Sequence, residues 1–65
     1  MSLIDYNQSQ KIAMQDFYFY ALIMAAMRKA DTENLEKLRE AWPATWAELQ
    51  ARCNAPGGLL DGETR

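Results

Sequence analysis

Few side chains in this 65-residue sequence could do chemistry, and their spacing does not favour it. There is no histidine, so the commonest general base and the commonest ligand of zinc, copper and haem are missing. Asp16 is the one carboxylate beside a long apolar run, where burial could make it a catalytic acid. A solvated residue, or the partner of a nearby Lys or Arg, is the simpler interpretation. Cys53 has no histidine to activate it and lies near the end of a predicted helix, where the helix dipole disfavours a nucleophilic thiolate.

The three glycines do not form a phosphate-binding loop. Gly57 and Gly58 follow a predicted helix instead of preceding one, and the Gly-Lys-Ser/Thr part of the motif is missing. No Cys, Asp and Glu residues stand at the spacing of a metal site. We therefore expect this chain not to be an enzyme, and we expect no catalytic residue, no cofactor and no bound metal.

The charge balance bears on nucleic-acid binding. Seven Lys and Arg against nine Asp and Glu give a net charge of −2, whereas nucleic-acid-binding domains are usually basic. The expected outer face of the second helical segment carries Glu33, Glu36 and Glu40, which repel phosphate. Direct binding to nucleic acid is therefore disfavoured, and a dimeric helical transcriptional regulator is kept as the alternative function.

Composition also bears on location. Residues 17–27 carry no charge, but on a helix they span only about 16 Å, against about 30 Å of hydrocarbon in a bilayer. The sequence begins without the basic region of a secretory signal, and a lone thiol suits a reducing compartment. We expect a cytoplasmic protein with no membrane partner.

Residues 5–30 are predicted to form one long helix. Asp5 is the expected N-cap, with Ser2 and Ser9 as alternatives. The segment is rich in Ala, Met, Leu, Gln and Lys, which are good helix formers. The aromatic residues 17–20 also suit a strand. Because no turn residue separates them from the helix-favouring residues that follow, the helix is preferred.

A second helical segment is predicted over residues 32–53, with Asp31 as its N-cap. The short connection makes the two segments antiparallel neighbours, so the predicted fold is an all-α helical hairpin. Pro43 either kinks this segment or ends one helix near Ala41 and begins another. We favour the kink.

The C-terminal residues are predicted to leave the helix and turn. Asn54 is expected to end the second helix in a left-handed conformation, and residues 55–58 to form a turn. Residues 1–60 are taken as a single helical domain and residues 61–65 as a disordered tail.

The helical periodicity separates an expected core from an expected interface. The core seam is predicted to contain Ala13, Phe17, Tyr20, Met24, Met27, Leu35, Leu38, Trp42 and Leu49. The residues predicted to contact a second subunit or another protein are Tyr18, Leu22, Phe19, Ile23 and Trp46.

The first helix is predicted to be apolar all round, and such a helix needs cover on more than one side. A chain of this size cannot supply that cover by itself, because small domains bury a small share of their surface. We therefore expect a homodimer, formed through the first helix into a four-helix bundle. The expected function is a protein–protein interaction module that adapts or inhibits another protein, whose identity the sequence does not give. A structural subunit of a larger particle is a further hypothesis.

Three short segments resemble small accessory proteins of transposable, Mu-type bacteriophages: residues 16–20, residues 41–43 and residues 54–60. Proteins of that kind often act by binding a host protein. The resemblance implies a host protein as partner and the host cytoplasm as location. It assigns no functional residue.

Overall fold

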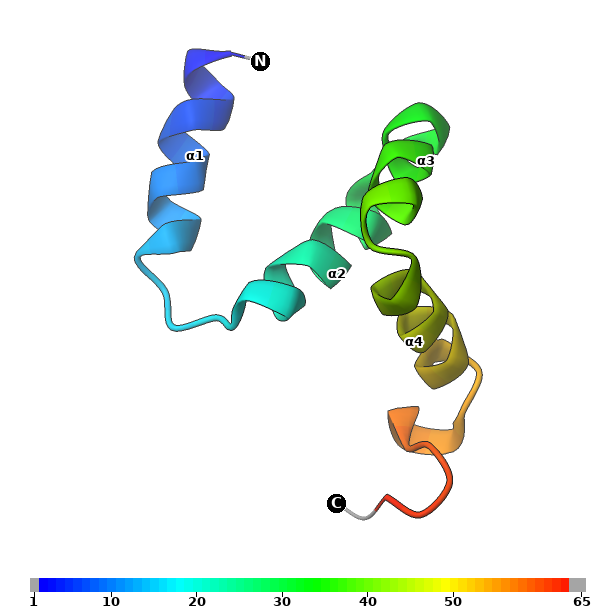
Figure 1. Ribbon diagram of the computed structural model, residues 1–65. Coiled ribbons are helices and arrows are strands. Elements are labelled where there is room, and N and C mark those ends of the chain that lie inside the picture. The colour runs from blue at the N-terminus through cyan, green and yellow to red at the C-terminus, as the bar shows by residue number, and fades with distance from the viewer. Residues whose placement is uncertain (1, 64–65) are drawn as a thin grey trace.

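The computed structural model describes residues 2–63, and that part of the chain is helical, without strands (Figure 1). The predicted all-α class is thereby confirmed. The elements are, in order, α1 (Leu3–Ala13), α2 (Phe19–Lys29), α3 (Thr32–Ala41), α4 (Pro43–Cys53) and the 3₁₀ turn η1 (Pro56–Gly58).

The first helix begins at a capping box formed by Ser2 and Asp5. The Asp5 backbone N–H donates to Ser2 Oγ at 3.1 Å, and the Ser2 backbone N–H donates to Asp5 Oδ2 at 3.2 Å. Two backbone donors that a helix start would leave unpaired are thus satisfied. Asp5 is therefore not the N-cap, and the alternative, Ser2, is correct.

The prediction of one helix over residues 5–30 is wrong. α1 ends at Ala13, α2 begins at Phe19, and Tyr18 between them is extended, with φ −70° and ψ 151°. Tyr and Phe are poorer helix formers than the Ala, Leu and Met around them, and they suit extended backbone. Helix propensity therefore favours a break beside these residues.

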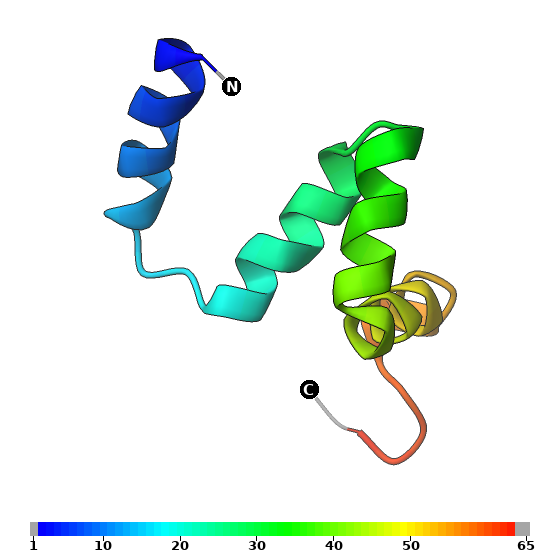
Figure 2. The ribbon, with the colours of Figure 1, turned by 45° about the horizontal axis from the view of Figure 1, so that its top comes forward.

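α2 and α3 are joined by Ala30 and Asp31 and meet at a sharp angle, as Figure 2 shows. The Asp31 side chain accepts a 2.8 Å hydrogen bond from the Asn34 backbone N–H. The predicted N-cap of the second segment is thereby confirmed, and this cap fixes the point at which the chain reverses.

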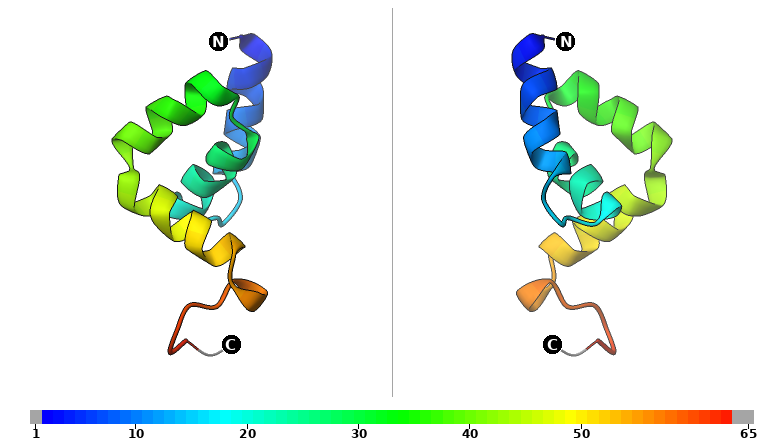
Figure 3. Two further views of the ribbon diagram at one scale, coloured as in Figure 1. Left: turned by 90° about the vertical axis from the view of Figure 1, so that its right-hand side faces the viewer. Right: turned by 90° about the vertical axis from the view of Figure 1, so that its left-hand side faces the viewer.

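The second segment is broken, not kinked. α3 ends at Ala41, Trp42 has φ −132° and ψ 65°, and Pro43 occupies the first turn of α4. Proline has no N–H to donate and its φ suits a first helical turn, while its ring excludes the preceding residue from the helical region. Figure 3 shows α3 and α4 leaving this point in different directions. The favoured kink is wrong, and the alternative of two helices is correct.

The chain after α4 turns at glycines. Asn54 is right-handed (φ −92°, ψ −4°), so its predicted left-handed conformation is wrong. Positive φ angles fall at Gly57 (61°), Gly58 (72°) and Gly62 (85°), which adopt them without a Cβ penalty. Of the predicted tail, residues 61–62 form a turn, Glu63 is also described, and residues 64–65 lie outside the described residues.

The packed part of the molecule is centred on α4, which contacts α2, α3 and η1. Among the described residues, only Met27 on α2 (3% exposed) and Leu49 on α4 (5% exposed) are buried hydrophobic side chains. α1 has no comparable contact with another element and stands apart from the other helices in Figure 1. The radius of gyration is 13.8 Å, whereas a compact domain of this length would have about 11 Å.

Candidate interaction surface

Exposed apolar side chains are concentrated in one part of the chain. Among residues 2–63, every large hydrophobic side chain that is exposed lies between Leu3 and Tyr20. Tyr18 (87%) and Met14 (85%) are the most exposed of them. The full set is Leu3, Ile4, Tyr6, Ile12, Met14, Phe17, Tyr18, Phe19 and Tyr20. We call this set the N-terminal apolar surface.

This surface arises because α1 is not strongly amphipathic. Leu3 and Tyr6 point to one side of the helix, whereas Ile4 and Ile12 point to others, so no single contact covers them all. None of the side chains of α1 is buried. The linker after α1 adds Phe17 and Tyr18, because extended backbone turns successive side chains to opposite sides. A surface of this kind suits contact with other apolar side chains.

An apolar groove of about 620 Å³ lies between α1 and α2. Its lining comes from Ser9, Ile12 and Ala13 of α1, from Phe17 of the linker, and from one side of α2 (Ala21, Leu22, Ala25, Ala26 and Lys29). The opposite side of α2 carries Met27, which faces α4. α2 is thus apolar on two sides, and one side is unfilled within the single chain.

The residues predicted to form an interface are distributed over several environments. Tyr18 and Phe19 are exposed, and Leu22 is half-buried in the groove. Phe19 makes an edge contact with Trp42 at a centroid distance of 6.3 Å. Ile23 and Trp46 are half-buried.

The predicted core seam is divided by the break after α1. Its members from α2 onward are buried (Met27, Leu49) or half-buried (Met24, Leu35, Leu38, Trp42). Ala13, Phe17 and Tyr20 are exposed, and this part of the prediction is corrected. The predicted seam requires one continuous helix from Ala13 to Met27, and the linker at residues 14–18 interrupts that helix. Tyr20 instead joins Met24, Ala44, Thr45 and Glu48 around a hollow of about 350 Å³ between α2 and α4.

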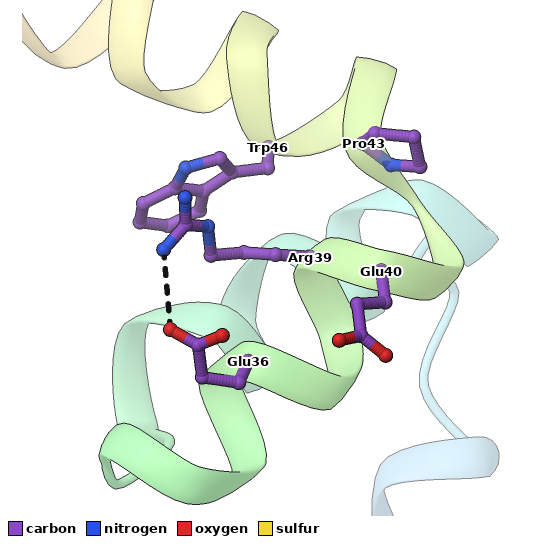
Figure 4. Close-up of a pocket in the computed structure, with 5 residues that line it drawn as sticks. All are labelled: Glu36, Arg39, Glu40, Pro43 and Trp46. Atoms are coloured by element: carbon purple, nitrogen blue, oxygen red, sulfur yellow. Dashed lines mark ion pairs between the residues drawn. The ribbon is translucent and has the colours of Figure 1, made fainter.

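A second, smaller pocket of about 230 Å³ lies where α3 meets α4 (Figure 4). The Arg39 guanidinium lies over the Trp46 ring, 5.4 Å from its centre, and pairs with Glu36 at 3.6 Å. Glu40 and Pro43 complete the lining. The Arg39–Trp46 contact joins the two helices on either side of the Pro43 break. Sequence reasoning missed it, because the broken axis, not a helical repeat, brings the two side chains together.

A charged cluster holds the C-terminal turn to α4. Arg52 Nη1 and Nη2 donate to the two carboxylate oxygens of Glu63 at 2.7 and 2.8 Å, and its Nε donates to Glu48 at 2.9 Å. The same guanidinium donates to the Gly58 carbonyl, and the Leu60 backbone N–H donates to Glu63. The hydrogen bonds from Arg52, and then the one from Leu60, lower the pKa of Glu63 from 4.5 to about 2. The two carboxylates raise the pKa of Arg52 above its usual value.

The side chains considered first for chemistry are not assembled into a site. Asp16 is exposed in the linker between α1 and α2. Cys53 is exposed at the end of α4, where Arg28 Nη2 lies 3.8 Å from its sulfur. Between residues 2 and 63, no group of three or more His, Cys, Asp or Glu side chains could hold a metal ion.

No family model, curated protein or solved structure matched this chain. Within the part of the chain that the structure describes, no helix combines the length and the apolar character needed to cross a bilayer.

The main residues that sequence reasoning missed are Leu3 and Ile4 of α1. They precede the helix predicted over residues 5–30, which assigned them no place in a seam or an interface. The sequence did contain an indication of them, because apolar residues are distributed on several sides of the helical axis at this end of the chain.

Proposed function

We propose that this chain is a non-enzymatic protein–protein interaction module, which works as a homodimer and binds another protein in order to adapt or inhibit it. The observation that supports this most directly is the N-terminal apolar surface. Nine large apolar side chains are exposed within residues 3–20, and such a concentration, unlike single scattered residues, is typical of a binding surface. Its composition also fits, because Tyr, Phe and Met are enriched at interface cores, where charged residues are depleted.

The part of the N-terminal apolar surface that does not line the groove is proposed to meet the other protein. It includes Leu3, Ile4, Tyr6, Met14 and Tyr18. Tyr is a frequent hot-spot residue and Met adapts to irregular surfaces. Tyr18 and Met14 are therefore the proposed anchors.

Two finer features of the fold belong to the same proposal. The short connection at residues 30–31 supports an antiparallel hairpin in which α2 pairs with the α3–α4 segment. Two such hairpins are proposed to associate into a helical bundle. We further propose that the module acts in the cytoplasm. The resemblance of residues 16–20 and 54–60 to small phage proteins supports a host protein as the target.

Affinity capture tests this function. The chain carrying Met14→Ala and Tyr18→Ala is compared with the wild type and with Gln50→Ala, which changes an exposed residue on α4. Loss of a hot-spot side chain costs at least about 2 kcal/mol, or about 30-fold in affinity. We expect a specific protein to be retained by the wild type and by Gln50→Ala, and lost from the double variant.

Equal capture by all three chains, or no specific protein with any of them, would refute the proposed function. Circular dichroism of each chain checks that helicity is unchanged. If the wild type instead binds duplex DNA with an affinity that falls steeply with salt, the alternative of a nucleic-acid regulator replaces this proposal.

A further inference from the structure

The groove between α1 and α2 is lined mainly by apolar side chains from both helices. One wall is the outer side of α2, on which Ala21, Leu22, Ala25 and Ala26 follow at helical spacing. Small side chains on such a wall let a second helix approach to the 8–10 Å axis separation of packed helices. The other wall carries Ile12 and Ala13 of α1. The groove thus has the shape and the chemistry of a helix-binding site.

We propose that a second copy of this chain fills the groove, with α1 and α2 of each copy packed against α2 and α1 of the other across a two-fold axis. This inference rests on the proposed function and names the occupant of one side of the N-terminal apolar surface. The four helices then enclose Ile12, Phe17 and Leu22 of both copies.

The surface area supports a second copy. The chain has 5666 Å² of accessible surface, whereas a compact monomer of 7.5 kDa would have about 4,250 Å². The excess is about 1,400 Å² per copy. Obligate homodimers bury from about 1,000 Å² per subunit upward, more than the roughly 800 Å² of an ordinary transient complex. The surface that this chain exposes beyond a compact monomer is thus of the size that an obligate homodimer buries on each subunit.

The charge pattern supports contact between identical surfaces. From Ile12 to Met27 the chain carries one charged residue, Asp16, which lies outside the groove lining. In a two-fold contact each residue meets its own copy or a symmetric neighbour, so a charged patch would repel itself. An uncharged patch does not. Lys29, the one charged residue of the lining, lies at the last residue of α2.

Folding gives an independent reason. Two buried hydrophobic side chains, Met27 and Leu49, are too little core to hold the described helices together. A partner surface that covers the exposed apolar side chains must then be present whenever the chain folds. Another copy of the same chain is present wherever the chain is made, whereas a different protein need not be. Many obligate dimers accordingly have no stable folded monomer.

A matched pair of variants tests the groove. Ala25→Glu places a carboxylate on the groove wall, and Ala47→Glu places the same group on the outer side of α4; both alanines are exposed in the single chain. In a monomer Ala25→Glu would even support α2, because Arg28 and Lys29 lie three and four residues further on. The two substitutions should therefore differ in their effect only if a partner occupies the groove.

Sedimentation equilibrium over a concentration series measures the outcome. We expect the wild type and Ala47→Glu to have twice the 7.5 kDa chain mass, and Ala25→Glu to dissociate at concentrations at least about 100-fold higher, because two like charges would be buried together. Helicity of Ala25→Glu that falls on dilution and returns on concentration also counts as dissociation.

A wild type that sediments as a folded single chain at high concentration overturns the inference. Assembly of Ala25→Glu as tight as that of the wild type also overturns it, because the contact would then lie elsewhere. Failure here is separable from failure of the proposed function. A monomer that still captures a specific protein through Tyr18 keeps the binding of another protein and loses the homodimer, whereas a dimer that captures nothing keeps the second copy and loses the binding.

Discussion

Arg52 connects three parts of the chain through one guanidinium group. It reaches back along α4 to Glu48, across to the Gly58 carbonyl at the end of η1, and forward to both oxygens of Glu63. The Glu48–Arg52 pair follows from their spacing of four residues on a helix. The bond to Glu63 does not follow from spacing, because it depends on the turn at the glycines. A planar, two-pronged contact of this kind is one that lysine could not reproduce.

The depressed pKa of Glu63 gives a pH dependence. Its folded value of about 2 lies below the ordinary 4.5, so the folded state binds this proton more weakly than the unfolded chain does. The contribution of the pair to stability is therefore complete above pH 4.5 and is lost as the pH falls toward 2. We expect Glu63→Gln to be less stable than the wild type at pH 7, with the difference vanishing near pH 2. Urea unfolding at several pH values measures it, and a constant difference across this range would contradict the role of the pair.

At the scale of elements, helix ends decide this fold more than helix interiors do. Ser2, Asp31 and Pro43 each mark the start of a helix, and all three signals are visible in the sequence. The caps were predictable as types, although Asp5 was preferred to Ser2 and a kink to a break at Pro43. The gap at residues 14–18 was not predictable from breakers, since it contains no glycine or proline. It lies beside the aromatic residues 17–20, which favour a helix less than their neighbours do, but this difference is too small to mark a break by itself.

The unpredicted break at residues 14–18 also limits how much of the candidate surface could be predicted from the sequence. Tyr18 and Leu22 were expected on an outer face, and they lie in the linker and in the groove. Leu3 and Ile4 of α1 precede the helix predicted over residues 5–30, so the sequence assigns them no interface role. Their role depends on the direction that α1 takes after the linker, and local sequence does not encode that direction.

The Asp31 cap is a testable element of the fold. Asp31→Ala removes the acceptor for the Asn34 N–H and should destabilise the folded state by about 1 kcal/mol. Asp31→Asn keeps a side-chain oxygen at the same place and should lose far less. Urea unfolding of the two variants at pH 7 measures the difference. Equal losses would show that the charge near the helix end, not the cap, is the stabilising feature.

At the scale of the whole molecule, the proposed homodimer couples the free energy of unfolding to the free energy of association. Under the proposed homodimer, a chain with so small an interior gains its remaining burial from a second copy, and its unfolding then depends on concentration. A tenfold rise in concentration corresponds to about 1.4 kcal/mol of dimer stability, which shifts the Tm of a domain of this size by about 5 °C or more.

Differential scanning calorimetry over a hundredfold concentration range tests this dependence. We expect the Tm of the wild type and of Ala47→Glu to rise steadily with concentration. Ala25→Glu should melt at lower temperature throughout. A wild-type Tm that stays constant would mean that the single chain is the cooperative unit.

The gap between α1 and α2 also sets the reach of the molecule. α1 is an 11-residue helix about 16 Å long, joined to the rest through the linker at residues 14–18. A change of 30° in the direction of this linker would carry the tip of the helix by about 8 Å, while α2, α3 and α4 stay as they are. The course of this linker therefore sets the width of the groove between α1 and α2, and with it the size of side chain or helix that the groove can accept.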